Sequence, residues 1–409
     1  MTRHSISVRL LALAMACTSA CALNAQTFKS GSNETDGDLD FSKIPGGPNY
    51  TFDPQKFSPP LDQDHDNVFN FKTINIPPGA TVTVSAQQVN GPMTWLATGN
   101  VNINGTLILG GANGLANNSL EQRSPAVPGP GGFYGGVGGN NTVAPTAGGG
   151  PNGSGGAAGS KSSNQGKAGG FIGNSFLVPL VGGSGGGGGF WDTTNPNIGG
   201  GGGAGGGAIL IASDGTITIG GTISANGGSA ANTCQSGGAG AGGAVRLAAN
   251  SITGGGRLLV AAGSQASCSN SGAGNGIIRL EAFQLNFTGT TAGAVYTGSP
   301  YATFVTGVPM LKVVSVAGVT VNPYPTGSFA VPDVAINSAN PVPIVVQGTN
   351  IPAGTTVQMQ FYSENGPNLT ASATLDQTLQ GTTTVTFPPG YSQGLVSASF
   401  TVQSQAPKR

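Results

Sequence analysis

The stretch from Gly205 to Gly289 decides the fold, because one pattern occurs in it three times. The three units are GGGAILIASDGTITIGGTISANGG (205–228), GGAVRLAANSITGGGRLLVAAGS (242–264) and NGIIRLEAFQLNFTG (275–289). Ala208, Ala244 and Gly276 open the units, about 36 and then about 33 residues apart. Alternating apolar and polar residues predict β-strands, and a repeat of this length predicts the stacked coils of a β-solenoid.

Composition favours an all-β chain of several domains. The 409 residues suffice for two or three domains, and glycine is the commonest residue, with 73 copies. After residue 25, we find no long run of apolar residues at helical spacing. Short strands and many turns fit this composition best.

The first 25 residues have the pattern of a secretory signal peptide. Arg3 and Arg9 form a basic start, Leu10–Cys17 an apolar centre, and small residues follow. A lipoprotein cleavage before Cys21 is the alternative. No second apolar run follows, so we expect a secreted protein without a transmembrane segment, located extracellularly, at the cell surface or in the periplasm.

The charge balance and the histidine content argue against several kinds of partner and site. Without Arg3 and Arg9, 13 basic side chains face 15 acidic ones, which gives no electrostatic case for binding nucleic acid or an anionic membrane. His65 is the only histidine after the signal peptide, so a Ser–His–Asp triad or a multi-histidine metal site is excluded. Residues 26–67 hold eight of the acids, and we expect an extended, poorly regular segment there.

The solenoid is expected over residues 68–305, with a long insertion. WLATGNVNINGTLILGGANG (95–114) is similar to ILIASDGTITIGGTISANGG (209–228), so the two segments are predicted to be equivalent coils. Residues 115–207 between them are Gly-rich. Such a segment is either a flexible loop or a bundle of extended chains, since bare glycine allows close backbone approach.

These two segments carry a resemblance to a known class of proteins. WLATGNVNINGTLILGG and ILIASDGTITIGGTISANGG resemble exported Gly-rich bacterial proteins that contain pectin-lyase-like parallel β-helices. The resemblance implies a right-handed parallel β-helix. Residues 306–405 contain alternating strands separated by Gly, Pro and Asn, which predict a small antiparallel β-sandwich. This part resembles the Ig-like modules appended to many bacterial surface proteins.

Cysteine spacing predicts one disulfide. Cys234 lies 26 residues after Ala208, and Cys268 lies 24 residues after Ala244. The two residues are therefore expected at nearly equivalent places in successive coils, about 4.8 Å apart. This separation suits a disulfide, and an exported chain allows one to form.

Two groups of residues are candidates for ligand binding. Asp62, Asp64 and Asp66 alternate like the start of a calcium loop, although the Gly and Glu that such a loop requires are absent. A solvated acidic linker is the alternative. Arg246 and Arg279 occupy matching coil positions and are expected to stack in a row, whereas Asp214 and Glu281 are expected to be isolated acids. The candidate glycan contacts are Trp95, Tyr134, Phe190, Trp191, Arg246 and Arg279.

The scarcity of ionisable groups favours a non-enzymatic function. We expect an exported structural or adhesive protein of the cell surface or matrix, with no cofactor unless calcium binds. The alternative is a β-helix protein that binds or degrades polysaccharide, which would need clustered acids on one face. Extracellular polysaccharide or cell-envelope components are the expected partners.

Overall fold

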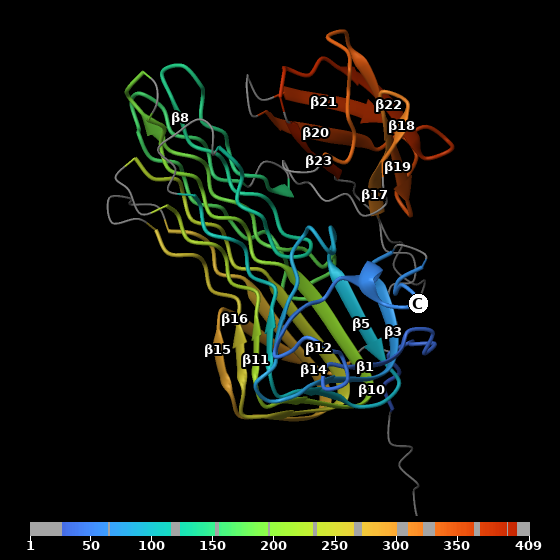
Figure 1. Cartoon of the computed structure of the whole chain (residues 1–409). Coiled ribbons are helices and arrows are strands. Elements are labelled where there is room, and N and C mark those ends of the chain that lie inside the picture. Colours follow the sequence, from blue (N-terminus) through green and yellow to red (C-terminus); the bar gives the residue numbers. More distant parts are fainter. Residues whose placement is uncertain are drawn as a thin grey trace, which may run out of the picture.

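Most strands of the protein lie in two parallel sheets (Figure 1). A computed structural model describes residues 27–63, 66–115, 123–151, 155–194, 197–231, 235–265, 272–300, 310–321, 332–363, 369–390 and 392–398. The larger sheet has the strand order β1 (Gly37–Asp40), β3 (Val68–Ile76), β5 (Met93–Ala97), β10 (Ala208–Ile219), β12 (Ala244–Gly254), β14 (Ile277–Phe287) and β16 (Ala294–Gly298). A further strand, β6 (Val101–Ile103), pairs with β3 and β10.

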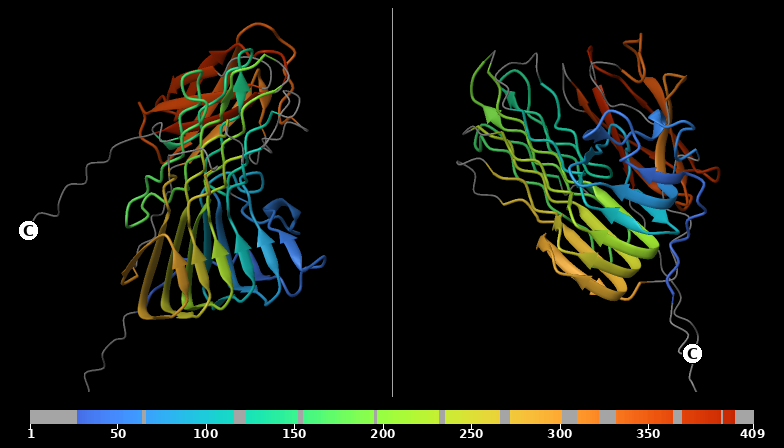
Figure 2. Two further views of the ribbon diagram at one scale, coloured as in Figure 1. Left: turned by 90° about the vertical axis from the view of Figure 1, so that its left-hand side faces the viewer. Right: turned by 60° about the horizontal axis from the view of Figure 1, so that its bottom comes forward.

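The second parallel sheet takes one strand after each visit to the first. Its order is β2 (Asn49–Thr51), β4 (Thr81–Thr83), β7 (Thr106–Ile108), β11 (Thr222–Ser224), β13 (Arg257–Leu259) and β15 (Thr290–Ala292). The chain thus passes repeatedly from one sheet to the other, as the ordered ribbons of Figure 2 show. The protein is therefore all-β with a large parallel sheet, and we call these two sheets the parallel body.

Strand register places the two similar segments next to each other. Ile211 is paired with Trp95, Ile217 with Val101, and Thr222 with Thr106. The difference in residue number between paired residues is the same in both sheets. Strands β5 to β7 therefore neighbour β10 and β11, although the Gly-rich segment separates them in sequence. The alternating inward residues of these strands form one continuous apolar core.

The acidic N-terminal segment differs from its predicted irregular form. Strands β1 and β2 lie within it and extend both parallel sheets. Asp38 and Asp40 point outward on either side of buried Leu39 and accept hydrogen bonds from Thr73 and Asn75. The alternating acids therefore mark the solvent face of a strand, and the expectation of a poorly regular segment, based on composition, did not use that periodicity.

The Gly-rich chains are ordered and bonded to one another. We call the described residues of 111–207 and 226–243 the Gly-rich bundle; its chains extend beyond the parallel strands in Figure 2. Gly186 N donates to Gly203 O and Gly203 N donates to Gly238 O, both at 2.9 Å. Two short strands, β8 (Gly139–Asn140) and β9 (Phe190–Trp191), pair within it. Of the two alternatives for this segment, the structure shows the bundle of extended chains.

The C-terminal part contains two antiparallel sheets around a separate core. One has the order β18 (Val319–Thr320), β17 (Met310–Val316), β19 (Val342–Thr349) and β22 (Gln380–Val385). The other has the order β21 (Leu369–Thr374), β20 (Thr356–Ser363) and β23 (Ser392–Ala398). Ile344 from the first sheet and Met359 from the second belong to one apolar cluster. Buried Arg123 of the bundle donates to Ser363 O and so connects the two parts.

Candidate functional site

The predicted arginine row lies on the outward face of β12 and β14. Arg246 and Arg279 are register partners, which confirms that they stack. The expectation that Glu281 is isolated is wrong, because both guanidinium groups bind it. Arg246 donates from Nε and Nη2 to Oε2 at 3.1 and 2.8 Å, and Arg279 Nε donates to Oε1.

Strand geometry explains this cluster. Arg279 and Glu281 are two residues apart on one strand and therefore point to the same face. The register partner of Glu281 is Ala248, whose small side chain leaves room for the long arm of Arg246. Glu281 is fully buried and Arg279 is 5% exposed. Each oxygen of the Glu281 carboxylate accepts a hydrogen bond from a guanidinium group, and neither is directed to solvent.

The 171–180 segment of the bundle covers the cluster. Ser175 O accepts a hydrogen bond from Arg279 Nη1 at 3.0 Å, and the ring of Phe176 lies 4.9 Å from the Arg279 guanidinium carbon. Leu177 is buried beside Ala208 and its neighbours in the sheet. The arginine row thus attaches the bundle to the parallel body. It does not form an open surface to which a glycan could bind.

The four aromatic candidates for glycan contact do not form an exposed row. Trp95 is fully buried and packs edge-on against Phe52 and Phe71, so it belongs to the core. Phe190 is also buried. Trp191 and Tyr134 are partly exposed and lie in the Gly-rich bundle. The predicted roles of Trp95 and Phe190 in glycan contact are therefore wrong, since an inward strand position hides the ring.

The calcium candidates stabilise a loop. Asp62 is 2% exposed, and its two carboxylate oxygens accept the backbone N–H groups of Asp66 and Asn67 at 2.9 and 3.0 Å. Asp66 accepts the N–H of Val68 at 2.8 Å. Asp64 lies outside the described residues. Within the described part of the chain, no group of three acids, histidines or cysteines is arranged to hold a metal.

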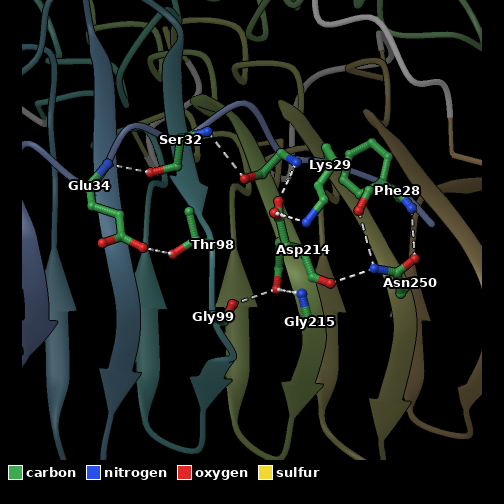
Figure 3. A network of polar contacts seen from close by, with 11 residues as sticks. Phe28, Lys29, Ser32, Glu34, Thr98, Gly99, Asp214, Gly215 and Asn250 are labelled. Atoms are coloured by element: carbon green, nitrogen blue, oxygen red, sulfur yellow. Dashed lines mark hydrogen bonds and ion pairs between the residues drawn. The ribbon is translucent and has the colours of Figure 1, made fainter.

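Asp214, predicted to be an isolated acid, binds the segment 28–34, which we call the strap (Figure 3). Its Oδ1 accepts the N–H of Ser30, and its Oδ2 lies 3.1 Å from Lys29 Nζ. Asn250 on the next strand accepts the N–H of Phe28 at 2.7 Å. The chain after residue 27 therefore crosses the outer face of the large sheet before it enters β1. Ser30 and Asp214 are 184 residues apart, so no local sequence pattern could predict their contact.

A cavity of about 380 Å³ lies beside β1, at the N-terminal end of the parallel body. Asp36, Asp38, Phe57 and Gln63 are among the residues that line it. Carboxylate and amide groups can bind sugar hydroxyls, and an aromatic ring can contact the apolar face of a sugar. Acidic, amide and aromatic residues thus share this cavity, and Asp36 and Asp38 also accept hydrogen bonds from Asn70 N and Thr73 Oγ1. An extended, poorly regular segment, as expected over residues 26–67, gives no indication of such a cavity.

Comparisons with known proteins add no relatives to these observations. No family model matches the chain, and no curated protein or solved structure matches it either. Among the described residues, no helix has both the length and the apolar character needed to cross a bilayer. The predicted signal peptide and the cysteine pair Cys234 and Cys268 lie outside the described residues.

Proposed function

We propose that the protein is an exported, non-enzymatic scaffold of the cell surface or matrix. In this proposal the parallel body is a right-handed β-helix similar to the pectin-lyase-like class, and the C-terminal sheets form an Ig-like module. The signal-like pattern of residues 1–25 supports export. The repeated crossing between two parallel sheets supports the β-helix.

The main support for this proposal is that Glu281 and Asp214 are already bound by other groups of the protein. Glycan-cleaving enzymes need carboxylates that reach the substrate, but Glu281 is enclosed by Arg246 and Arg279. Asp214 is bound by Lys29 and the N–H of Ser30. These acids stabilise attachments between segments, which suits a rigid support.

The architecture suggests how such a support acts. The continuous core makes the parallel body stiff, and the bundle extends from it towards loops such as residues 140–145 and 191–194. Hydrogen bonds between neighbouring Gly-rich chains hold these loops in place. The scaffold would present the C-terminal module to polysaccharide or cell-envelope components.

An activity screen tests the non-enzymatic assignment. The purified chain is incubated with panels of neutral and uronic-acid polysaccharides, and new reducing ends and unsaturated products are measured. We expect no cleavage above a heat-treated control. Cleavage that is lost in Asp36→Asn or in Asp38→Asn would contradict the scaffold proposal and identify a catalytic pair beside β1.

The cavity beside β1 favours a second candidate function, glycan binding without cleavage. A glycan array, probed with and without calcium, is expected to show binding to neutral glycans in both conditions. Asp38→Ala should weaken this binding, because Asp38 lines the cavity. Asp192→Ala is the matched control, since Asp192 is an exposed acid of the bundle that does not line the cavity. Equal binding by both variants would rule out this site.

A further inference from the structure

At one end of the parallel body the outermost strands are β16 and β15, and none of the strands that the structure describes pairs with their outer edges. All five residues of β16 are exposed, and Val295 is 40% exposed. Leu285 of β14 is also 40% exposed, although Ile252, its register partner on β12, is fully buried. The side chains of Val295 and Leu285 occupy core-facing positions, because their register partners Ile278 and Ile252 belong to the core. The apolar core is therefore open to solvent at the end formed by β14, β15 and β16, which we call the open end.

The opposite end of the parallel body is closed by the protein's own chain. Phe41, Phe52 and Leu61 are buried there and belong to the core. Phe57 packs against Phe52 with ring centroids 5.7 Å apart. Because these residues cap that end, it offers no exposed core on which an open end could dock. A copy stacked head to tail would therefore leave the exposed apolar residues of its open end without an apolar partner surface.

The open end also lacks the usual protection of an edge strand. Natural sheets commonly guard exposed edges with charged side chains, proline or bulges, because unpaired N–H and C=O groups attract other strands. Residues 282–311, which include β15 and β16, contain no charged side chain. Two such ends therefore approach each other without repulsion between like charges on their edge strands.

We propose that two copies of the chain associate through their open ends. A two-fold axis that crosses both edges pairs β16 with β16 of the second copy, and β15 with β15, in antiparallel orientation. The geometry selects this occupant, because a partner must supply two strand edges at the spacing of β15 and β16. A second open end has that spacing by symmetry, whereas a single extended peptide would satisfy only one edge. The inference does not depend on the proposed function.

Sedimentation of the purified chain without residues 1–25 tests this association. We expect the mass of a dimer, and slower exchange of the β16 amides with solvent as protein concentration rises. Val295→Lys should halve the mass, because it places two charges close to the axis. Val319→Lys is the matched control, since Val319 is 47% exposed on the edge strand β18 of the C-terminal part. It should remain a dimer.

Three results would overturn the proposal. The first is a monomeric wild-type chain whose β16 amides exchange at a rate independent of concentration. The second is a Val295→Lys variant that remains a dimer, and the third is a Val319→Lys variant that becomes a monomer. If Val295→Lys fails to fold, the concentration dependence of exchange in the wild-type chain decides alone.

Discussion

Replacement of Gly203 by alanine tests whether bare glycine surfaces hold the bundle together. A Cβ at this position would lie 2.0 Å from Gly228 O and 2.5 Å from its carbonyl carbon. The two chains must separate by about 1.4 Å to reach ordinary contact at 3.4 Å. Both atoms belong to backbone, so no side chain can rotate away, and the chains themselves must move.

The expected loss of stability follows from two opposing effects. Overpacking destabilises by about 1–3 kcal/mol, and the neighbouring bonds Gly186 N to Gly203 O and Gly203 N to Gly238 O are each worth about 1 kcal/mol. Alanine also restricts the unfolded chain, which stabilises by about 0.4–1 kcal/mol. Overpacking and the loss of the two hydrogen bonds together outweigh the effect on the unfolded chain. Gly203→Ala should therefore lower the free energy of unfolding of the bundle by about 3 kcal/mol.

The measurement is urea unfolding followed by Trp191 fluorescence in a Trp95→Phe background, so that the signal comes from the bundle. Gly255→Ala is the matched control, because the nearest atom to its added Cβ is Thr288 Oγ1 at 3.8 Å. It should leave the unfolding midpoint unchanged or raise it slightly. A Gly203→Ala variant as stable as Gly255→Ala would refute the packing of the bundle described here.

Four further predictions follow from the described contacts. Glu281→Gln leaves the buried Arg279 and the partly exposed Arg246 without their anion and should cost about 3–5 kcal/mol. Lys29→Gln removes a cation whose side chain is 75% exposed and should cost less than about 1 kcal/mol; equal losses for the two variants in urea unfolding would contradict the Arg246–Glu281–Arg279 cluster. Burial and Asp333 raise the pKa of Tyr134 from 10.0 to about 12, so the folded chain holds this proton more tightly than the unfolded chain. The stabilising contribution of Tyr134 should then be constant below about pH 10 and fall towards about pH 12, and the same pH dependence of stability in Tyr134→Phe would count against this origin. Asp214→Ala should accelerate limited proteolysis near residues 28–34, whereas Asp192→Ala should not; equal rates would show that the strap does not depend on Asp214. Peptide mapping without reductant should recover Cys234 linked to Cys268, and free thiols at both positions would disprove the predicted disulfide.

The strand repeat could be predicted because its signal is local. Alternation of apolar and polar residues in 209–228 and 95–114 identified strands, and the register of Ile211 with Trp95 agrees with that similarity. The match of Arg246 with Arg279 followed from the same count. Periodicity therefore gave the face on which each side chain lies.

Contacts between distant segments could not be predicted in this way. The partners of Asp214 lie 184 residues earlier, at Ser30, and Ser175, which covers Arg279, lies 104 residues earlier. Neither pair leaves a pattern in a single sequence. Composition is also misleading at residues 26–67, because many acids together with Pro and Gly predict a poorly regular segment, whereas Asp38 and Asp40 lie on the outer face of β1.

The sequence alone could not predict that the Gly-rich bundle is ordered, because its order depends on packing between chains and not on the local conformational preference of glycine. A Gly-rich sequence is compatible with a flexible chain, and only the close approach of Gly183, Gly203 and their neighbours distinguishes the two states. The hydrogen bonds that join these chains connect residues from several separate tracts. The sequence showed that the segment can pack closely, but not which tracts pair.

Hydrogen exchange of the glycine amides in residues 183–207 tests the scaffold account most directly. If the bundle is a rigid part of the protein, the amides of Gly186 and Gly203 should exchange far more slowly than those of an unstructured peptide, because each is bonded to a neighbouring chain. Exchange at the rate of an unstructured peptide would show a flexible linker and would contradict the account.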